Sequence, residues 1–413
     1  MLNKLTELDS DFVRAQFPAF TEPSLQGWAF FENAGGSYTC QQVIDRLTHY
    51  YTATKVQPYY PYPASMAAGQ RMDEAYAWLS AYLNIDNAEL SLGPSTTQNV
   101  YVLANALRPM WTAGDEIIVS CQDHEANAGA WRRLDQTGLV IRDWHIDPDS
   151  GRLELDDLDQ LMGERTKMVA FPHASNVIAH INPVQEITRR AHAAGAISVV
   201  DGVSYAPHGL PDLQALGVDI YLFSTYKTWG PHLGAMYVRQ ELRDKMTNQG
   251  HFFHQGSPRS ELTPAGPDHA QIAAAAGIAE YLDALYGHHF DGQANASERG
   301  RRLHDLFRRH ETALLTPLLE FLRQREDVQI IGPDDPSIRA ATVSILPLNK
   351  PVMEVAERLQ SHKLMVGTGD FYGVRPLKEL NIQLDPGVLR LSFVHYTTQA
   401  EINQLISGLE QSL

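Results

Sequence analysis

Lys227 is the side chain with the clearest chemical potential in the sequence. It follows the apolar run 218–223, within the segment Ser224-Thr-Tyr-Lys-Thr-Trp-Gly-Pro-His-Leu-Gly. A lysine just past a strand, with glycines that let the backbone approach a ligand closely, could form a Schiff base with an aldehyde cofactor. Taken alone, Lys227 is more commonly interpreted as a solvated loop lysine, so the prediction depends on neighbouring motifs.

Asp201 supplies a second chemical group, upstream of the lysine in Ser198-Val-Val-Asp-Gly. It ends a strongly apolar segment, and ligands of open α/β sheets bind at the carboxyl ends of the strands. A carboxylate placed there can keep a heteroaromatic nitrogen protonated. A turn or a helix cap is the alternative interpretation of an Asp-Gly pair.

A segment of small hydroxyl residues, Gly93-Pro-Ser-Thr-Thr-Gln-Asn, leads from an apolar run into a helical pattern. Free N–H groups at a helix start, together with the hydroxyls of Thr96 and Thr97, could hold a phosphate monoester. A simple helix N-cap is the alternative.

Two further polar side chains follow other apolar runs. His124 is placed where an imidazole could stack on a cofactor ring, although a lone loop histidine is more often structural. Asn176 could donate to a phenolic oxygen or to a substrate carboxylate. Because these groups all come at the carboxyl ends of expected strands, together they fit pyridoxal phosphate.

The elements that must position these groups alternate along the chain. Short runs rich in Val and Ile are separated by helical patterns, which predicts a mostly parallel sheet with helices on both faces. The seven expected strands are 89–93, 116–120, 139–146, 167–171, 196–200, 218–223 and 234–238.

The alternation of short apolar runs with helical patterns stops after Pro267. Helical patterns at 270–285 and 297–324 precede a second alternating region, in which runs at 328–331, 340–346, 364–368 and 388–394 are interleaved with helical patterns at 351–362 and 398–409. We therefore expect a large domain over residues 25–285 and a smaller α/β domain formed by 1–24 and 286–413.

Composition excludes several classes of protein. The 413 residues carry a formal net charge of −16, with no Lys/Arg run longer than a pair, so nucleic acid and anionic membranes are poor candidate partners. No stretch approaches the roughly 20 apolar residues of a membrane span, and the first ten residues lack the pattern of a secretion signal, so a cytoplasmic protein is expected. The two cysteines, Cys40 and Cys121, have no metal-ligand spacing and are expected to be buried small hydrophobes; no metal site is predicted.

The motifs together resemble the class V aminotransferase family of fold type I pyridoxal phosphate enzymes, and within it the cysteine desulfurase and selenocysteine lyase branch. The matching pieces are GPSTTQN, DHEANAGAW, SNVIAHINPV, VVDG with APH, and FSTYKTWGP. The resemblance extends from Phe30-Phe-Glu-Asn-Ala-Gly-Gly to Leu389-Arg-Leu-Ser. It implies a large domain with a mostly parallel seven-stranded sheet, a smaller C-terminal α/β domain and a homodimer.

The resemblance also implies roles for individual residues. Lys227 would carry the cofactor and later move the α-proton, Asp201 would bind the pyridine nitrogen, and His124 would stack on the ring. The remaining cofactor contacts that it implies are Thr96, Thr97, Asn176, Ser204, Ser224, Tyr226 and, across a dimer interface, His269. Arg390 matches the arginine that clamps the substrate α-carboxylate. Asn176, Gly35 and Tyr372 complete the expected substrate site for a small amino acid.

The sequence departs from the branch at the residue that defines desulfurases. The family's nucleophilic cysteine lies in a mobile loop, and the corresponding stretch here is Gly367-Thr-Gly-Asp-Phe-Tyr-Gly-Val-Arg, with Tyr372 at the cysteine position. Ser204 stands where a glutamine usually faces the cofactor, and Tyr226 where a histidine usually precedes the lysine.

A lyase that eliminates a β-substituent without a persulfide cysteine is therefore the leading hypothesis. A class V aminotransferase or an amino-acid epimerase is the alternative. A non-catalytic protein of the same fold is a third hypothesis, disfavoured because a scaffold has no need of these polar groups at one site.

Overall fold

Seven strands form the central sheet of the computed structural model, which describes residues 7–413. They are β2 (Leu90–Gly93), β3 (Glu116–Ser120), β4 (Val140–Trp144), β5 (Thr166–Pro172), β6 (Ile197–Asp201), β7 (Ile220–Ser224) and β8 (Gly234–Val238), in the order β2-β8-β7-β6-β5-β3-β4. Strands β3 to β7 pair in parallel with one another, whereas β8 is antiparallel to both of its neighbours, β7 and the edge strand β2. The predicted mostly parallel sheet is confirmed.

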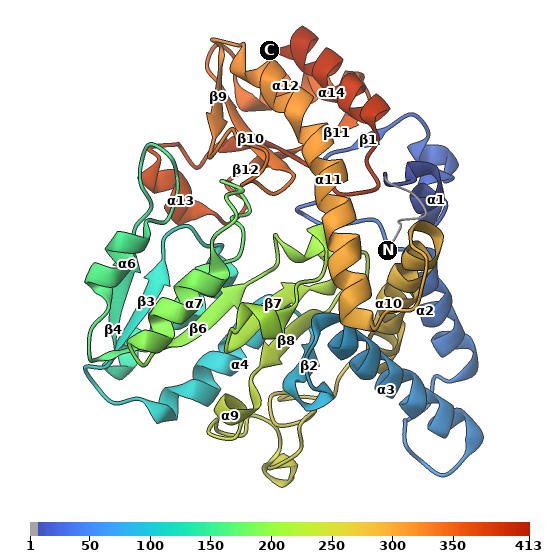
Figure 1. Ribbon diagram of the computed structural model, residues 1–413, viewed down its shortest axis with the longest axis vertical. Coiled ribbons are helices and arrows are strands. Elements are labelled where there is room, and N and C mark those ends of the chain that lie inside the picture. Colours follow the sequence, from blue (N-terminus) through green and yellow to red (C-terminus); the bar gives the residue numbers. More distant parts are fainter. Residues whose placement is uncertain (1–6) are drawn as a thin grey trace.

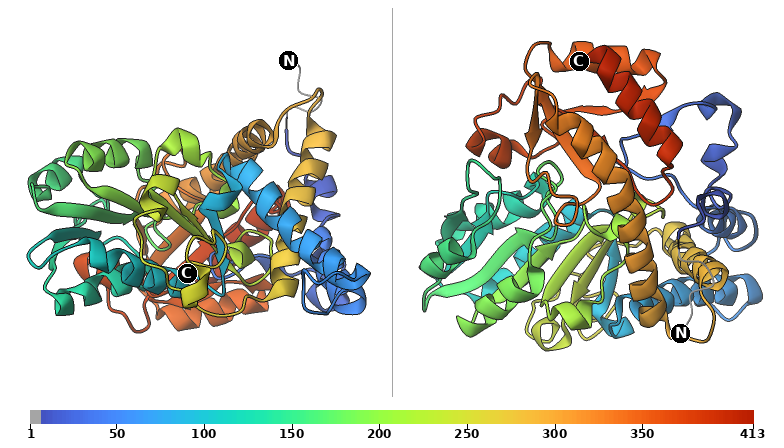
Figure 2. Two further views of the ribbon diagram at one scale, coloured as in Figure 1. Left: turned by 90° about the horizontal axis from the view of Figure 1, so that it is seen from below. Right: turned by 45° about the horizontal axis from the view of Figure 1, so that its top comes forward.

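Successive strand residues point to opposite faces of this sheet, as the two-residue period of a strand requires. In β3, Ile117 and Val119 pack in the core that contains Leu103 of α4 (Thr96–Leu107), whereas Ile118 packs in the core that contains Ile187 of α7 (Val184–Ala193). Both faces are therefore covered by helices, as the turned view in Figure 2 also shows. The near-continuous apolar runs of the sequence follow from this double burial.

Fourteen α-helices occur within residues 7–413 (Figure 1). Besides α4 and α7 they are α1 (Ser10–Arg14), α2 (Gln41–Ala53), α3 (Pro63–Leu83), α5 (Glu125–Arg132), α6 (Leu155–Leu161), α8 (Leu213–Leu216), α9 (Gln240–Arg243), α10 (His269–His289), α11 (Ala296–Arg323), α12 (Val352–Ser361), α13 (Val374–Glu379) and α14 (Gln399–Ser412). The four helices expected after Pro267 are thus confirmed as α10, α11, α12 and α14. No helix among the described residues is long and apolar enough to cross a membrane.

A second, antiparallel sheet is formed by the C-terminal part of the chain. Its strands are β9 (Val328–Ile331), β10 (Thr342–Pro347), β12 (Gly367–Gly369) and β13 (Val388–Ser392), in the order β12-β13-β10-β9. The long helix α11 links the two parts: Leu306 packs in the core shared with the central sheet, and Leu318 packs in the core under the second sheet. Figure 1 shows α11 reaching from the C-terminal part of the chain down to the region of α10 and α3.

The strand expected at 364–368 is divided in the structure. β11 (Leu364–Met365) pairs in parallel with β1 (Ala29–Phe30), whereas β12 pairs antiparallel with β13. The chain changes partner at Val366, so the apolar run serves two sheets rather than one. The pairing also ties residues 29–30 to the C-terminal part of the chain. The expected domain boundaries stay a prediction.

The packing of α10 on α2 leaves no room for a side chain at Gly277. A Cβ there would lie 2.5 Å from the backbone N of Val43 and 2.7 Å from the backbone C of Gln42. We expect Gly277→Ala to lower the free energy of unfolding by about 1–3 kcal/mol, because backbone must shift to admit the methyl group. Chemical denaturation measures this change.

Gly287→Ala is the matched control, because a Cβ at Gly287 of the same helix meets nothing within 4 Å. It should be neutral or stabilising by up to about 1 kcal/mol, since alanine has the higher helix propensity. Equal stability of the two variants would contradict the close approach of α10 to α2.

Candidate active site

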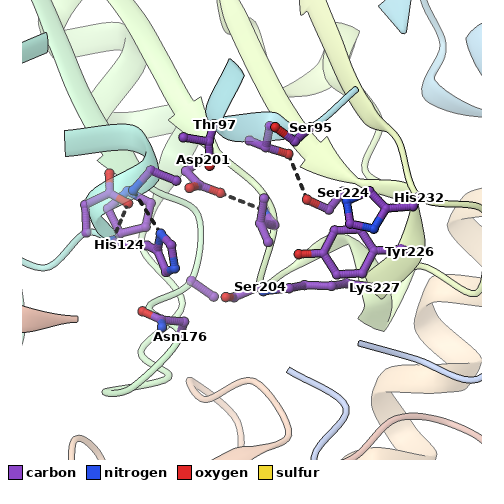
Figure 3. A pocket seen from close by; sticks show the side chains of 16 residues that line it. Ser95, Thr97, His124, Asn176, Asp201, Ser204, Ser224, Tyr226, Lys227 and His232 are labelled. Carbon is purple, nitrogen blue, oxygen red and sulfur yellow. Dashed lines mark hydrogen bonds between the residues drawn. The ribbon is translucent and has the colours of Figure 1, made fainter. Parts of the chain in front are cut away.

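One pocket collects side chains from the carboxyl ends of the central strands. Asp201 ends β6, Lys227 follows β7, and His124 lies just after β3. In Figure 3 the labelled side chains converge on this pocket from separate strand ends. The sequence-predicted residues that line it are Thr96, Thr97, His124, Asn176, Asp201, Ser204, Ser224, Tyr226 and Lys227.

The start of α4 forms an anion cradle at one side of the pocket. Ser95 caps the helix by accepting a hydrogen bond from Gln98 N, and Ser95, Thr96 and Thr97 at the helix start all line the pocket. Thr96 Oγ1 lies 2.8 Å from Ser224 Oγ, so two hydroxyls from different elements meet here. Gly234 of β8 permits the approach, because its Cβ would lie 2.4 Å from Thr96 N.

Lys227 is held in a tight connection between β7 and β8. It ends the 3-10 turn Thr225–Lys227, and the loop closes where Thr225 N donates to Leu233 O at 2.9 Å. Its side chain is buried. Burial lowers the pKa of the lysine to about 8, and the positive charge of Arg390 is the second largest cause of this shift. The negative charge of Asp201 acts in the opposite direction. A substantial fraction of the amine is therefore neutral near physiological pH, as a nucleophile or a base requires.

Two buried carboxylates that interact with each other, Asp201 and Asp123, also line the pocket. Asp201 accepts a hydrogen bond from Val203 N at 2.8 Å, and burial raises its pKa to about 6. Asp123 accepts from Asn127 Nδ2 at 2.6 Å, and burial together with the charge of Asp201 raises its pKa well above the ordinary value. Asp123 was not predicted as a site residue, because an acid before a histidine carries no distinctive sequence signal.

His124 is the N-cap of α5, and this position fixes its protonation state. Its Nδ1 accepts a hydrogen bond from Ala126 N at 2.9 Å, so the ring proton is on Nε2. Burial, followed by the charges of Lys227 and Arg390, lowers its pKa to about 3. The imidazole is therefore neutral, and its flat ring lines the pocket.

A second pocket adjoins the first and contains the residues expected to hold a substrate. Gly35, His124, Asn176, Tyr226, Lys227, Tyr372 and Arg390 all line it. Arg390 is buried on β13, its Cζ lies 3.7 Å from the ring centre of Phe371, and its Nη1 donates to Asn176 O at 3.3 Å. The second sheet thus supplies a guanidinium to a site built mainly on the first.

Glu32 is a member of this second pocket that sequence reasoning missed. Its carboxylate accepts a hydrogen bond from Arg390 Nη2, across 358 residues of sequence. The contact depends on the pairing of residues 29–34 with the C-terminal strands, which no local pattern predicts.

Three remaining predicted residues have distinct surroundings. The ring of Tyr226 stacks on His232, with centroids 4.5 Å apart and an interplanar angle of 7°. Tyr372 is 69% exposed and lies at the rim, 5.3 Å from the His124 ring. His269 is the first residue of α10 and is not among the side chains that line either pocket, so its role across a dimer interface stays a prediction.

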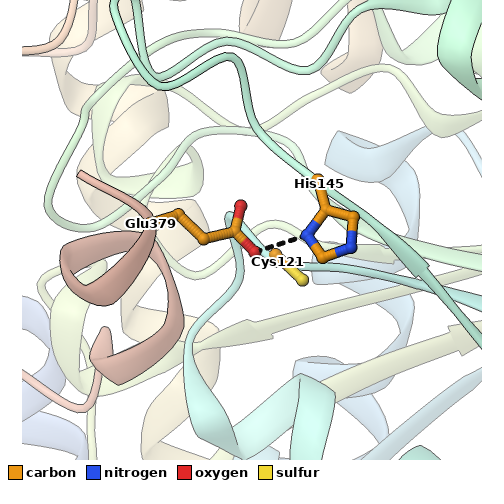
Figure 4. A group of neighbouring side chains, drawn as sticks. All are labelled: Cys121, His145 and Glu379. Atoms are coloured by element: carbon orange, nitrogen blue, oxygen red, sulfur yellow. Dashed lines mark hydrogen bonds and ion pairs between the residues drawn. The ribbon is translucent and has the colours of Figure 1, made fainter. Parts of the chain in front are cut away.

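Both cysteines are buried and unpaired, and neither lines the two pockets. Cys121 belongs to a small cluster in which its Sγ, a ring nitrogen of His145 and a carboxylate oxygen of Glu379 lie within 4.8 Å of one another (Figure 4). Arg132 Nη2 is 3.7 Å from this Sγ and sets a permanent positive charge against it. Glu379 accepts from Ile146 N at 2.9 Å, so the cluster fastens α13, and the Tyr372 segment before it, to the end of β4.

Comparison with known proteins agrees with this arrangement. A family model described as aminotransferase class V matches residues 29–405. The aminotransferase-like protein FGM3 of Gibberella zeae is 32% identical over 97% of this chain and 98% of its own length. The cysteine desulfurase-like protein ustD of Aspergillus flavus is 30% identical over 98% of this chain and 90% of its own length. The solved structure of the cysteine desulfurase from Thermococcus onnurineus is similar in fold, with a TM-score of 0.84 and 23% identity over 98% of each chain.

The fold and the site define a fold type I enzyme of the kind that depends on pyridoxal phosphate. Within that class, the chain belongs to the class V aminotransferase family.

The residues present fit the cofactor that members of this family use. The pocket offers an anion cradle for a phosphate, a buried amine for an aldehyde, a buried carboxylate for a ring nitrogen and a neutral imidazole for a ring face. In addition, Asn176 Oδ1 is buried without a hydrogen-bond partner among residues 7–413, which points to a donor that the chain itself does not supply.

The buried acids predict a pH dependence of the apoprotein's stability. The folded state holds the Asp201 proton more tightly than the unfolded chain does, because its pKa is about 6 rather than 3.8. The free energy of unfolding attributable to this group therefore falls as pH rises from about 4 to about 6, and Asp123 acts in the same direction. Asp201→Asn should accordingly gain stability relative to wild type across this interval.

Urea denaturation of both apoproteins at a series of pH values measures this difference. Asp149→Asn, which removes a carboxylate at an exposed position, is the control. A difference for Asp201→Asn that does not change with pH would contradict the raised pKa of Asp201, because it would mean that the group binds its proton equally well in the folded and unfolded states.

Proposed function

We propose that this enzyme binds pyridoxal 5'-phosphate at the first pocket and a small amino acid at the second. Lys227 would hold the aldehyde carbon, Asp201 the ring nitrogen, and His124 the ring face. Thr96, Thr97 and Ser224 would bind the phosphate, and Asn176, Ser204 and Tyr226 would contact the rest of the cofactor. The convergence of a buried amine of lowered pKa with a buried carboxylate in one pocket is the observation that carries this proposal.

We further propose a carbon–sulfur lyase that acts by β-elimination. When bound, the cofactor withdraws electrons from the substrate α-carbon. Arg390 binds the substrate carboxylate, and the Lys227 amine takes the Cα proton. The electron pair left by that proton forms a Cα–Cβ double bond as the Cβ–S bond breaks. The sulfur leaves with its bonding pair and takes up a proton, which gives hydrogen sulfide from cysteine and a sulfenic acid from a cysteine sulfoxide. Water then converts the remaining three-carbon unit into pyruvate and ammonia.

The absence of a suitably placed cysteine favours direct elimination over persulfide transfer. Tyr372 occupies the rim position, and the two cysteines of the chain lie buried elsewhere. The Tyr372 hydroxyl would act as an acid near the leaving group. An aminotransferase or an amino-acid epimerase is the alternative, and the name of the aminotransferase-like relative FGM3 supports the first of these.

We also propose that the protein is a cytoplasmic homodimer in which His269 reaches the phosphate site of the partner subunit. The chain would divide into a large domain of residues 25–285 and a small domain of residues 1–24 and 286–413. Residues 1–6 of the small domain lie outside the described residues. Exposed aromatic side chains at Tyr59, Tyr60 and Tyr62 offer contact area for a second copy. Two unpaired cysteines suit a reducing compartment.

The product formed from sulfur-containing substrates tests the proposed reaction. The purified holoenzyme is incubated separately with cysteine, a cysteine sulfoxide and alanine, while pyruvate and the cofactor spectrum are followed. We expect pyruvate from a sulfur substrate, and at least a roughly 100-fold loss of rate in Lys227→Ala, because the variant lacks the base. Lys245→Ala, at an exposed position, is the matched control.

Two outcomes would overturn parts of the proposal. Stable conversion of the cofactor to its pyridoxamine form by alanine, without pyruvate from the sulfur substrates, would assign an aminotransferase. A holoenzyme preparation with no visible cofactor band that depends on Lys227 would contradict the whole assignment.

A further inference from the structure

Arg390, the proposed carboxylate-binding residue (the carboxylate clamp) of the second pocket, is already paired with a carboxylate of the chain itself, that of Glu32. A guanidinium can bind a carboxylate through two parallel hydrogen bonds along its Nη1/Nη2 edge or its Nε/Nη2 edge, and Nη2 contributes one N–H group to each. Nη2 of Arg390 donates to Glu32. Nη1 donates to Asn176 O, and Nε is buried without a partner among the described residues. On the edge that Glu32 occupies, a substrate carboxylate therefore cannot make the two-point contact while Glu32 remains in place.

The space for the Glu32 carboxylate is made by two glycines. A Cβ on Gly35 would lie 1.9 Å from Glu32 Oε2, and a Cβ on Gly367 would lie 2.9 Å from Glu32 Oε1. Gly35 comes from the segment after β1 and Gly367 from β12, so the carboxylate sits between two parts of the chain that are distant in sequence. Gly35, predicted to contact substrate, has this additional role.

The pairing of the backbone around Glu32 with β13 places Glu32 beside Arg390. Residues 31–34 lie along β13, where Ser392 N donates to Phe31 O at 2.7 Å and Ala34 N donates to Ser392 Oγ at 2.8 Å. The two side chains differ in exposure: that of Arg390 is 3% exposed and that of Glu32 is 28% exposed. Glu32 is thus the partner that can turn toward solvent when another carboxylate enters.

We propose that Glu32 is an internal competitor for the carboxylate clamp and sets the affinity of the enzyme for carboxylate-bearing ligands. This inference rests on the proposed role of Arg390. When a ligand binds, its carboxylate replaces that of Glu32 on the buried guanidinium of Arg390. The buried positive charge therefore has a negative partner both before and after binding. The apparent affinity is reduced by the fraction of molecules in which Glu32 occupies Arg390.

Acetate, a carboxylate without an amine, is the probe that isolates the clamp. Its inhibition constant against the holoenzyme is measured with the sulfur-containing substrate that the wild type accepts, together with KM and kcat. In Glu32→Gln we expect the acetate inhibition constant and KM to fall by about threefold to tenfold, with kcat changed far less, because a neutral amide competes poorly for Arg390. Glu32→Asp keeps the charge but has a shorter reach, and should lower both constants to an intermediate degree.

Glu125→Gln is the matched control, because Glu125 lines the same pocket but pairs with Arg375. Its acetate inhibition constant should stay within about twofold of wild type, an interval of roughly 0.4 kcal/mol. An unchanged or raised constant in Glu32→Gln, or in Glu32→Asp if the first variant does not fold, would show that Glu32 orients Arg390 rather than competing for it.

Arg390→Gln separates failure of this inference from failure of the proposed function. Loss of acetate inhibition in Arg390→Gln, combined with no gain in Glu32→Gln, overturns only the role of Glu32. Retention of acetate inhibition in Arg390→Gln would overturn the assignment of Arg390 as the clamp, and the inference with it.

Discussion

Burial of unlike charges around two adjoining pockets, which share Lys227, is the constraint on which the rest of the structure depends. Lys227, Asp201 and Arg390 are all buried, and taking an ion out of water costs free energy unless other charges and hydrogen bonds compensate. The lowered pKa of the lysine and the raised pKa of the aspartate are direct consequences of that cost. The first pocket therefore holds groups whose protonation is balanced near neutrality, which is the condition for moving protons.

Both sheets supply charged side chains to the two pockets. The parallel sheet brings the ends of β3, β6 and β7 to one edge, and the antiparallel sheet carries Arg390 to the same place. Because α11 packs into both cores, the distance between the sheets is fixed by a continuous helix rather than by a flexible connection. The cluster around Glu379 fastens the rim segment that contains Tyr372.

Much of this site could be predicted from the sequence because its residues follow apolar runs that have a single reasonable structure. A parallel sheet brings the carboxyl ends of its strands together, so Asp201, Lys227 and His124 could be placed at one edge without any tertiary information. Glu32 and Asp123 could not be recognised. The contact of Glu32 with Arg390 spans 358 residues, and the raised pKa of Asp123 depends on its burial beside Asp201. Likewise, the division of 364–368 between two sheets depends on which strands are available as partners.

The attachment of a cofactor to Lys227 is the central claim, and borohydride reduction tests it most directly. The purified protein is reduced, digested and mapped by mass spectrometry, with unreduced protein as the control. The account predicts a phosphopyridoxyl group on the peptide that contains Lys227 and on no other lysine in significant yield. A modification confined to other lysines, or protein that carries none after incubation with pyridoxal phosphate, would contradict it.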